Sequence, residues 1–225
     1  MNLKILNELE RVLKASPQVL RDKTKLQQMI QATFNIQLDD VSFKSIGSLI
    51  DKIDNAVLSK YFGEVWQPKT KKFKYSGLKL IDEINSLKPR SVLDLGCGYN
   101  EFKGKINNLI GIDPYNKNAD IRIGILDYIP NHKFDVIVCL GSINFGSTDK
   151  IFAELEHAVK LCDSNGKMFF RVNPGHQHEP PESKWISFYP WDATFIQNCA
   201  DYFNLKILDM RNDNQDRMYF VWHKL

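Results

Sequence analysis

The residues best suited to bind a ligand follow a short apolar stretch near the middle of the chain. Residues 91–95 read Ser-Val-Leu-Asp-Leu and run into the turn Gly96-Cys97-Gly98. Glycine lets the backbone adopt positive φ angles and approach a ligand closely. An apolar run that ends in such a turn is typical of a buried strand whose carboxyl end faces a binding site.

A second acidic residue stands where it could serve the same ligand. Asp113 follows the short apolar segment 109–112 and lies 19 residues after Asp94. A carboxylate about 20 residues beyond a glycine-bearing turn can accept hydrogen bonds from ribose hydroxyls. The two signals together predict a cofactor that contains a nucleoside.

A sheet is needed to bring these residues together. Strands are expected at 91–95, 109–112, 119–127, 134–140, 167–172, 205–210 and 217–223. Helices are expected after Ser76, after Thr148 or Asp149, and after Asp192, with Asn165-Gly166 as a turn before the fifth strand. Only 211–216 separate the last two strands, which forces an antiparallel hairpin. The fold class is therefore α/β, with a doubly wound, mostly parallel sheet and a C-terminal antiparallel hairpin.

One edge of this sheet should lack a helix that usually connects parallel strands. The connection 114–118 is much shorter than the dozen or so residues, roughly, that a helical crossover requires. We therefore expect no crossover helix between the strand that ends before Asp113 and the one at 119–127.

The chain divides into three parts by pattern. Residues 1–62 show apolar positions at helical spacing and predict a small helical region, which is an appended layer, a substrate lid or a partner surface. Residues 63–75 form a linker in which four lysines alternate with three aromatic residues. This linker is either a solvated connector or an arm that binds nucleic acid. Residues 76–225 form the sheet-containing domain.

Composition narrows the class of protein. The chain has 225 residues, 43% of them hydrophobic, and lacks an apolar run near the ~20 residues that cross a bilayer. A cytoplasmic protein without a membrane partner is the expectation. The cysteines, at 97, 139, 162 and 199, form no CxxC pair and are expected to be reduced thiols. Residues 1–75 carry 13 basic and 8 acidic residues, so this third of the chain permits an anionic partner.

The stretch Val92 to Gly98, Asp113 and the closing hairpin together resemble the class I S-adenosylmethionine-dependent methyltransferases over about residues 74–225. The resemblance implies S-adenosyl-L-methionine as cofactor and methyl transfer by in-line displacement. It places the methionine part of the cofactor against Asp94, Gly96, Cys97 and Gly98, and the ribose on Asp113. The chain is also similar to compact methyltransferases of some bacteriophages, in its Asn-Pro-Gly, Glu-Pro-Pro and Phe-Tyr-Pro-Trp segments.

The sequence departs from the family pattern at two places. Asn100 replaces the third glycine, at a position where asparagine tolerates a left-handed conformation. Gly124-Ile125 stands where many relatives have Gly-Asp, so Asp127 or Leu126 is the substitute expected at the adenine. Further cofactor contacts are expected from Pro114, Leu140 and Gly141. A dinucleotide enzyme is disfavoured because it requires glycine at position 101, which is Glu101.

Candidates for acid–base chemistry follow the fifth expected strand. His176, His178 and Glu179 are general-base candidates for an acceptor that must lose a proton, and the alternative is that they are ordinary loop residues. They lack a fourth clustered ligand, so no metal site is predicted.

The methyl acceptor, a small molecule or a nucleic acid, stays open. Asn173-Pro174 resembles the motif by which amino-methylating nucleic-acid enzymes bind a base, but it follows the fifth expected strand and that motif follows the fourth. The aromatic residues Trp185, Phe188, Tyr189 and Trp191 form either a packed flap or a wall for the acceptor. A catalytically silent binding or assembly module is the remaining alternative.

Overall fold

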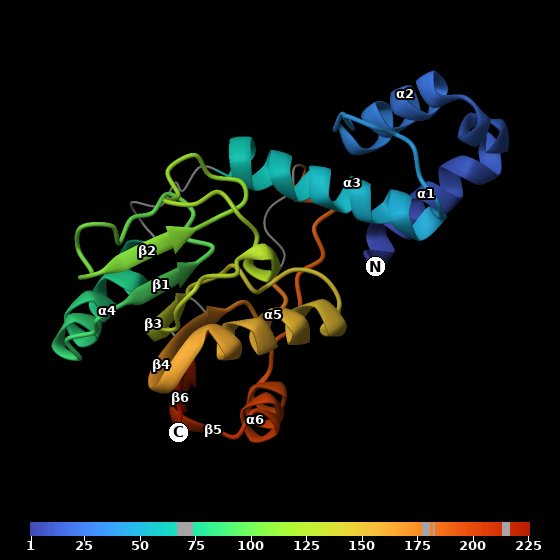
Figure 1. Cartoon of the computed structure of the whole chain (residues 1–225). Coiled ribbons are helices and arrows are strands. Elements are labelled where there is room, and N and C mark those ends of the chain that lie inside the picture. Colours follow the sequence, from blue (N-terminus) through green and yellow to red (C-terminus); the bar gives the residue numbers. More distant parts are fainter. Residues whose placement is uncertain (67–73, 177–180, 182, 213–216) are drawn as a thin grey trace. The chain divides into compact units, whose positions relative to one another are not determined.

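Strands from the middle and the C-terminal part of the chain form one six-stranded mixed sheet (Figure 1). The strands are β1 (Val92–Leu95), β2 (Leu109–Ile112), β3 (Phe134–Cys139), β4 (Cys162–Val172), β5 (Leu205–Asn212) and β6 (Met218–Lys224), in the order β2-β1-β3-β4-β6-β5. β2, β1, β3 and β4 are parallel, whereas β6 is antiparallel to both β4 and β5. The predicted α/β class with its closing hairpin is confirmed.

The computed structural model describes residues 1–66, 74–176, 181, 183–212 and 217–225, with the side chains of 74–76 excepted. These residues fall into two compact units. One unit comprises Met1–Trp66 with Gln177–Ser187, and the other comprises Gln67–His176 with Phe188–Leu225. A separate linker at 63–75 stays a prediction, because 67–73 lie outside the described residues.

Alternation along the strands gives the sheet two apolar faces. Leu93, Ile137 and Phe170 pack with α5 (Thr148–Leu161) and α6 (Ala193–Tyr202) on one face. Their chain neighbours, such as Val92 and Val138, pack with α4 (Lys74–Ser86) on the other. Side chains of a strand point alternately to opposite faces, so each core strand is buried on both sides and reads as a continuous apolar run.

The strand order changes direction at β1. The chain passes from β1 to β2 on one side and then returns to place β3 on the other side of β1. In open α/β sheets the crevice outside the carboxyl ends of strands at such a switch point is the usual ligand site. The loops that follow β1 and β3 therefore bound the place where a ligand is expected.

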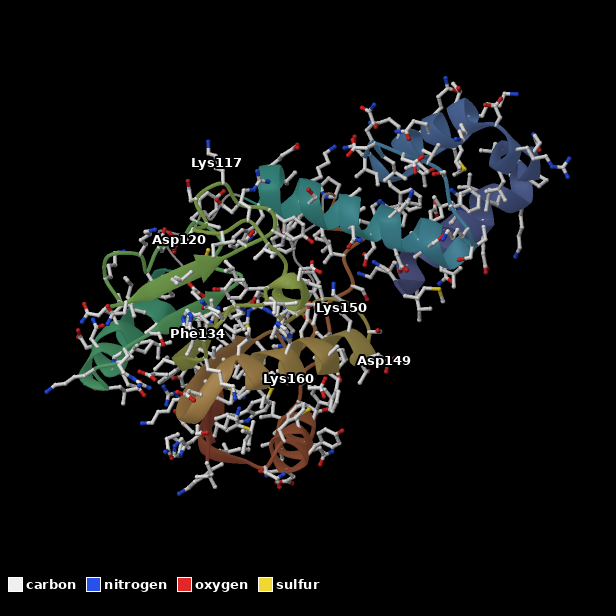
Figure 2. The ribbon with its side chains drawn as sticks, in the orientation of Figure 1. Lys117, Asp120, Phe134, Asp149, Lys150 and Lys160 are labelled. Carbon is white, nitrogen blue, oxygen red and sulfur yellow. The ribbon has the colours of Figure 1, made fainter. Side chains whose placement is uncertain are left out.

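Side chains cap the amino ends of α5 and α6, whereas α4 begins at Lys74, two residues before the expected cap Ser76. The side chain of Asp192 accepts from the Phe195 amide at 2.7 Å, as predicted, whereas α5 is capped by Ser147, one residue before the expected Thr148. Asp149 and Lys150 lie at the start of α5 and Lys160 lies at its other end (Figure 2).

The expected strand at 119–127 is wrong. Only one bridge, Ile112 to Ile121, joins this segment to β2, and Ile125–Asp127 form a short 3₁₀ helix, η3. The physical reason lies in Asp120, whose carboxylate accepts from the Gly111 amide at 2.9 Å. A side chain thus occupies a donor on the edge of β2 that a neighbouring strand would use. The predicted absence of a crossover helix holds.

β4 begins earlier than predicted. It starts at Cys162 rather than Lys167, and its register to β3 shifts between the Phe134–Cys162 and Val136–Lys167 pairs. Asn165, with φ of 61°, lies in this irregularity, so the expected turn forms a bulge inside the strand.

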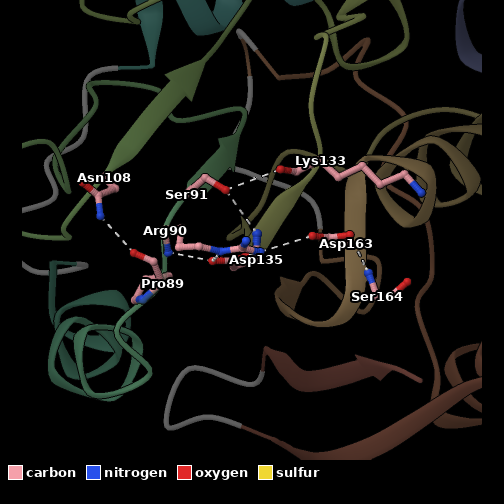
Figure 3. Close-up of polar contacts among 8 residues, drawn as sticks. All are labelled: Pro89, Arg90, Ser91, Asn108, Lys133, Asp135, Asp163 and Ser164. Atoms are coloured by element: carbon pink, nitrogen blue, oxygen red, sulfur yellow. Dashed lines mark hydrogen bonds and ion pairs between the residues drawn. The ribbon is translucent and has the colours of Figure 1, made fainter.

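An ion-pair network joins the amino ends of the central strands (Figure 3). Arg90 donates through its backbone amide and its guanidinium to Asp135, and it also reaches Asp163 at 3.4 Å. The hydrogen bonds from Arg90 lower the pKa of Asp135. Ser91 links β1 to β3 by accepting from the Asp135 amide and donating to the Lys133 carbonyl. These contacts fix the amino-terminal ends of the strands, opposite to the carboxyl ends where the ligand site is expected.

The N-terminal unit is built from α1 (Leu3–Ala15), η1 (Pro17–Arg21), α2 (Lys23–Phe34), α3 (Ile46–Lys60) and η2 (Tyr61–Val65), with Ser45 capping α3 as predicted. Asn2 is 3% exposed and holds three segments of this unit together. Its amide oxygen caps α1, and its amide nitrogen donates to Asp54 at 2.7 Å and to the Trp185 carbonyl at 2.8 Å. Among the residues described, no helix is long and apolar enough to cross a membrane.

Replacing Lys224 should weaken the junction between α5 and the sheet. Its ammonium donates to the carbonyls of Val159 and Cys162 at 2.8 and 2.9 Å, where α5 ends. Losing a cationic donor at a helix C-terminus costs about 1–2 kcal/mol. Urea denaturation of Lys224→Met should show a fall of this size in the free energy of unfolding. The exposed Lys206 provides the control, and equal stability of Lys224→Met and Lys206→Met would contradict the assignment.

Candidate active site

The turn after β1 is fixed by backbone hydrogen bonds to β2. The amides of Gly96 and Cys97 both donate to the Ile112 carbonyl, at 2.8 and 2.9 Å. Gly96 and Gly98 have φ angles of 70° and 53°, in the region that favours glycine. The two glycines serve different purposes. A Cβ on Gly96 would lie 2.1 Å from the Cβ of Ser142, whereas a Cβ on Gly98 would meet no atom within 4 Å. Gly98 therefore presents an open backbone surface that a ligand can approach.

Asn100 stabilises the turn instead of pointing into that open space. Its φ of 55° confirms the predicted left-handed conformation. Its amide nitrogen donates at 3.1 Å to both the Asn118 carbonyl and the Asp120 carboxylate. A Cβ on Gly111 would lie 2.6 Å from the Asn100 amide oxygen and 2.9 Å from Cys97. Gly111 thus lets the turn pack directly on β2, a role that sequence reasoning missed although a glycine inside a four-residue strand was its signal.

Two carboxylates lie at this turn in different environments. Asp113 is held by three amides, from Gly98 at 3.1 Å and from Tyr115 and Asn116 at 2.8 Å. Asp94 is 3% exposed, and none of the described residues donates a hydrogen bond to it. Burial, together with the negative charge of Asp113, raises the pKa of Asp94 to about 7. A buried carboxylate without a partner is unfavourable, so this arrangement suits a ligand that brings a positive charge or hydrogen-bond donors.

The loop after β3 is tied to its neighbours by Ser142 and Asn144, neither of which the sequence singled out. The Ser142 hydroxyl donates to the Leu95 carbonyl at the end of β1. The Asn144 amide donates to the Gly141 carbonyl at 2.9 Å and accepts from the Asn173 amide at 2.8 Å. The loops after β1, β3 and β4 are therefore held together at the carboxyl ends of the parallel strands.

The remaining cofactor candidates lie after β2, within η3 and after β3. Leu140 lies near Gly77 of α4, where a Cβ would be 3.2 Å from it. Pro114 is exposed, Leu126 is 44% exposed, and the Asp127 carboxylate lies 3.1 Å from a Cβ position on Gly124. Their contact with a cofactor stays a prediction.

Only one of the three catalytic candidates lies among the described residues. His176 is exposed, and His178 and Glu179 lie outside the described residues. Both amide atoms of Asn173 bond at 2.7 Å to the backbone of His176, so this asparagine is engaged within its own loop. In the described part of the chain, no group of three or more histidine, cysteine, aspartate or glutamate side chains is arranged to hold a metal.

The four aromatic residues beyond this loop divide between the two units. Trp185 belongs to the N-terminal unit and packs edge to face on Phe34, with ring centroids 5.0 Å apart. Phe188 packs on Phe145, and Trp191 is 2% exposed with its indole N–H bonded to the Ile143 carbonyl. The interpretation of these residues as packed aromatics fits Trp185, Phe188 and Trp191.

Gly111→Ala should disturb the turn after β1. The added methyl group must displace Cys97 or Asn100, and such overpacking costs about 1–3 kcal/mol. Thermal and urea unfolding would measure the loss. Gly47→Ala is the matched control, because a Cβ there meets only the Ser45 hydroxyl at 3.7 Å. Stability equal to that of the parent protein would contradict the packing role of Gly111.

Asp94→Asn should flatten the dependence of stability on pH. Because the pKa of Asp94 is raised to about 7, the folded protein holds a proton that the unfolded chain has already released. The free energy of unfolding therefore falls as pH rises from about 4 to about 7, by at most about 1.4 kcal/mol per pH unit from this group. The difference in slope between the parent and Asp94→Asn isolates this contribution, with the exposed Asp82→Asn as control. Identical slopes would show that Asp94 is solvated normally.

Comparisons with known proteins rest on structure alone. No protein-family model matches the sequence, and no curated protein matches it either. Among solved structures, one similar protein is the N-methyltransferase NodS from Bradyrhizobium japonicum, crystallised with S-adenosylhomocysteine. It is 12% identical in sequence with a TM-score of 0.54, and the match covers 74% of this chain and 96% of the NodS chain.

Two further structures agree. The 1,6-didemethyltoxoflavin-N1-methyltransferase of Burkholderia thailandensis is 11% identical with a TM-score of 0.57, over 84% of this chain and 94% of its own. The magnesium protoporphyrin IX methyltransferase of Synechocystis, with bound S-adenosylmethionine, is 13% identical with a TM-score of 0.52, over 76% and 97%. The chain therefore has the class I S-adenosylmethionine-dependent methyltransferase fold.

Proposed function

We propose that the protein is a methyltransferase that uses S-adenosyl-L-methionine and transfers its methyl group to a small-molecule acceptor. The observation that carries the proposal is the buried Asp94 carboxylate, which accepts no hydrogen bond from the described residues and stands in β1 just before the turn that contains the open Gly98. S-adenosylmethionine brings an ammonium group, a sulfonium and a ribose diol, and no phosphate. These groups fit a site with two carboxylates that form no ion pair with the described residues.

Each residue of the turn has a role in this proposal. Asp94 balances the ammonium of the methionine part, and the absence of a Cβ at Gly98 admits that part against the backbone. Asp113 is oriented by the Gly98, Tyr115 and Asn116 amides, so its carboxylate is held ready for the ribose hydroxyls. The amides of Gly96 and Cys97 hold the turn against β2, and Asn100 stabilises it through hydrogen bonds to Asn118 and Asp120. Leu126 and Asp127, with Pro114, Leu140 and Gly141, border the adenine.

The proposed reaction does not depend on a particular acid–base pair in the protein. When bound, the cofactor supplies a methyl group on a sulfonium, an electrophile that an acceptor attacks in line. The protein contributes by holding the acceptor at near-attack distance and by excluding water. His176, His178 and Glu179 remain the candidates for removing a proton from the acceptor.

A small acceptor is favoured over nucleic acid by two observations. Two of the three structures named above belong to enzymes whose names specify small acceptors, 1,6-didemethyltoxoflavin and magnesium protoporphyrin IX. Asn173, which could have gripped a base, uses both amide atoms within its own loop. The lysine-aromatic segment that would serve a nucleic-acid methyltransferase lies mostly outside the described residues.

Binding of S-adenosylhomocysteine tests the cofactor assignment. The purified protein should bind it in calorimetry, and Asp113→Ala should weaken binding by at least about tenfold, the effect of losing one charge-assisted hydrogen bond. Asp82→Ala, which alters an exposed carboxylate on α4, is the control. Thermal melting of both variants shows whether the Asp113 variant remains folded. Absence of binding by the parent protein would refute the proposal.

Methyl transfer is tested separately. Tritiated S-adenosylmethionine should label a component of fractionated lysate that survives digestion with nuclease and with protease. Label that is lost after nuclease would instead identify nucleic acid as the acceptor. Cofactor binding without any transfer would favour the silent binding module.

A further inference from the structure

Asn144 is a buried polar residue that joins three separate segments of the sheet-containing unit. It lies in the loop after β3 and is 5% exposed. Its amide nitrogen donates to the Gly141 carbonyl at 2.9 Å, and its amide oxygen accepts from the Asn173 backbone amide at 2.8 Å. Its backbone carbonyl accepts from the Tyr189 amide at 2.8 Å. One asparagine thus connects the loop after β3, the loop after β4 and the segment 188–191.

Asn173 extends this connection to His176. Asn173 is 1% exposed, and its amide oxygen accepts from the His176 backbone amide at 2.7 Å. Its amide nitrogen donates to the His176 carbonyl, also at 2.7 Å. One buried side chain therefore holds both backbone groups of His176, a residue that is itself exposed. A continuous series of hydrogen bonds runs from Gly141 through Asn144 and Asn173 to His176.

Close packing keeps the turn 173–176 in this position. An isolated antiparallel bridge joins Pro174 to Pro190. Gly175 has a φ of 91°, and a Cβ there would lie 3.3 Å from Pro190. His176 is the last residue of this unit before the chain passes to the other unit. Because the chain leaves the unit here, the bridge and the hydrogen bonds described above are what fix the turn.

The two ends of this series of hydrogen bonds have different places in the proposed reaction. Gly141 is a candidate cofactor contact, and His176 is a candidate base for the acceptor. Their loops follow the carboxyl ends of β3 and β4, which are adjacent parallel strands. In-line transfer needs donor and acceptor at a fixed separation, and a misplacement of about 1 Å can cost about 100-fold in rate. A side chain that sets the distance between the two loops therefore affects the rate without touching either substrate.

We propose that Asn144 is a positioning residue for methyl transfer, which holds the turn 173–176 and its His176 at a fixed distance from the loop after β3. This role rests on the function proposed above. The side-chain amides of Asn144 and Asn173 each donate and accept a hydrogen bond. A buried polar network whose members are bonded to one another favours a single arrangement of the loops that it joins.

The rate of methyl transfer tests this role. Tritiated S-adenosylmethionine is incubated with the lysate fraction that the parent protein labels, under single-turnover conditions. Asn144→Ala should slow transfer by about 10- to 100-fold, because the turn 173–176 is no longer held in place. Its affinity for S-adenosylhomocysteine in calorimetry should change little, because the Ser142 hydroxyl still holds the loop after β3 to the Leu95 carbonyl.

Asn85→Ala is the matched control. The Asn85 side chain also donates to one carbonyl, that of Lys105, and accepts from one amide, that of Asn107, both at 2.9 Å. These contacts lie at the amino-terminal ends of β1 and β2, opposite to the candidate site. Asn85→Ala should lower the melting temperature and leave the transfer rate unchanged. Equal transfer rates for Asn85→Ala and Asn144→Ala would show that Asn144 is only structural.

Hydrogen exchange gives a readout that does not depend on activity. In Asn144→Ala the backbone amides of Asn173 and His176 should exchange about tenfold faster, because the hydrogen bond that holds their turn is lost. The Cys97 amide, which bonds to the Ile112 carbonyl, should exchange at its parental rate. Unchanged exchange at Asn173 and His176 would contradict the connection.

Asn173→Ala provides a second variant. Its backbone amide can still bond to Asn144, whereas both hydrogen bonds to His176 are lost. Asn173→Ala should slow transfer about as much as Asn144→Ala, and the double variant should be no slower than either, because both side chains act through one connection. Additive losses would contradict this.

The outcomes separate the two proposals. If the parent protein transfers no label, the proposed function fails, and the role of Asn144 fails with it. If the parent transfers label and the folded Asn144→Ala and Asn173→Ala variants do so at the parental rate, methyl transfer stands and the role of Asn144 is refuted.

Discussion

The tight contact between the turn after β1 and its two neighbours is the constraint on which the site depends. Gly96 faces Ser142 from the loop after β3, and Gly111 of β2 receives Cys97 and Asn100. A side chain at either glycine would push the turn away from the sheet. Since the amides of Gly96 and Cys97 bond to β2 and the Ser142 hydroxyl bonds to β1, the turn is fixed on both sides before any ligand arrives. Gly98, the position left open, is then presented in a defined place.

Fixing the turn has an electrostatic consequence. Asp94 is carried into the interior near the end of a strand whose side chains are all buried, and the negative charge of Asp113 acts on it. None of the described residues compensates this charge. Such groups lower stability unless a ligand supplies what they lack. An uncompensated carboxylate at the carboxyl end of a central strand is better explained by a cationic ligand than by the requirements of folding.

The sequence predicted the fold well because its signals are local. Apolar runs such as 134–139, the spacing of Asp94 and Asp113, and the short connection before β6 each define an element or a pairing without information from elsewhere. The errors occur where a tertiary contact overrides the local pattern. The segment 119–127 is apolar enough for a strand, but the Asp120 carboxylate takes the Gly111 amide on the edge of β2. The role of Ser142 could not be found from the sequence, because it arises only when the loop after β3 meets the end of β1.

Proton linkage on binding S-adenosylhomocysteine tests the central claim most directly, namely that Asp94 awaits a positively charged ligand. Near pH 6.5 a large fraction of Asp94 is protonated in the free protein, and an ammonium beside it favours the ionised form. Calorimetry in buffers of different ionisation enthalpy should therefore show release of protons on binding, and affinity that rises from about pH 5.5 to about pH 7.5. The release should be smaller in Asp94→Asn. Binding without proton release, with an affinity independent of pH in this range, would contradict the account.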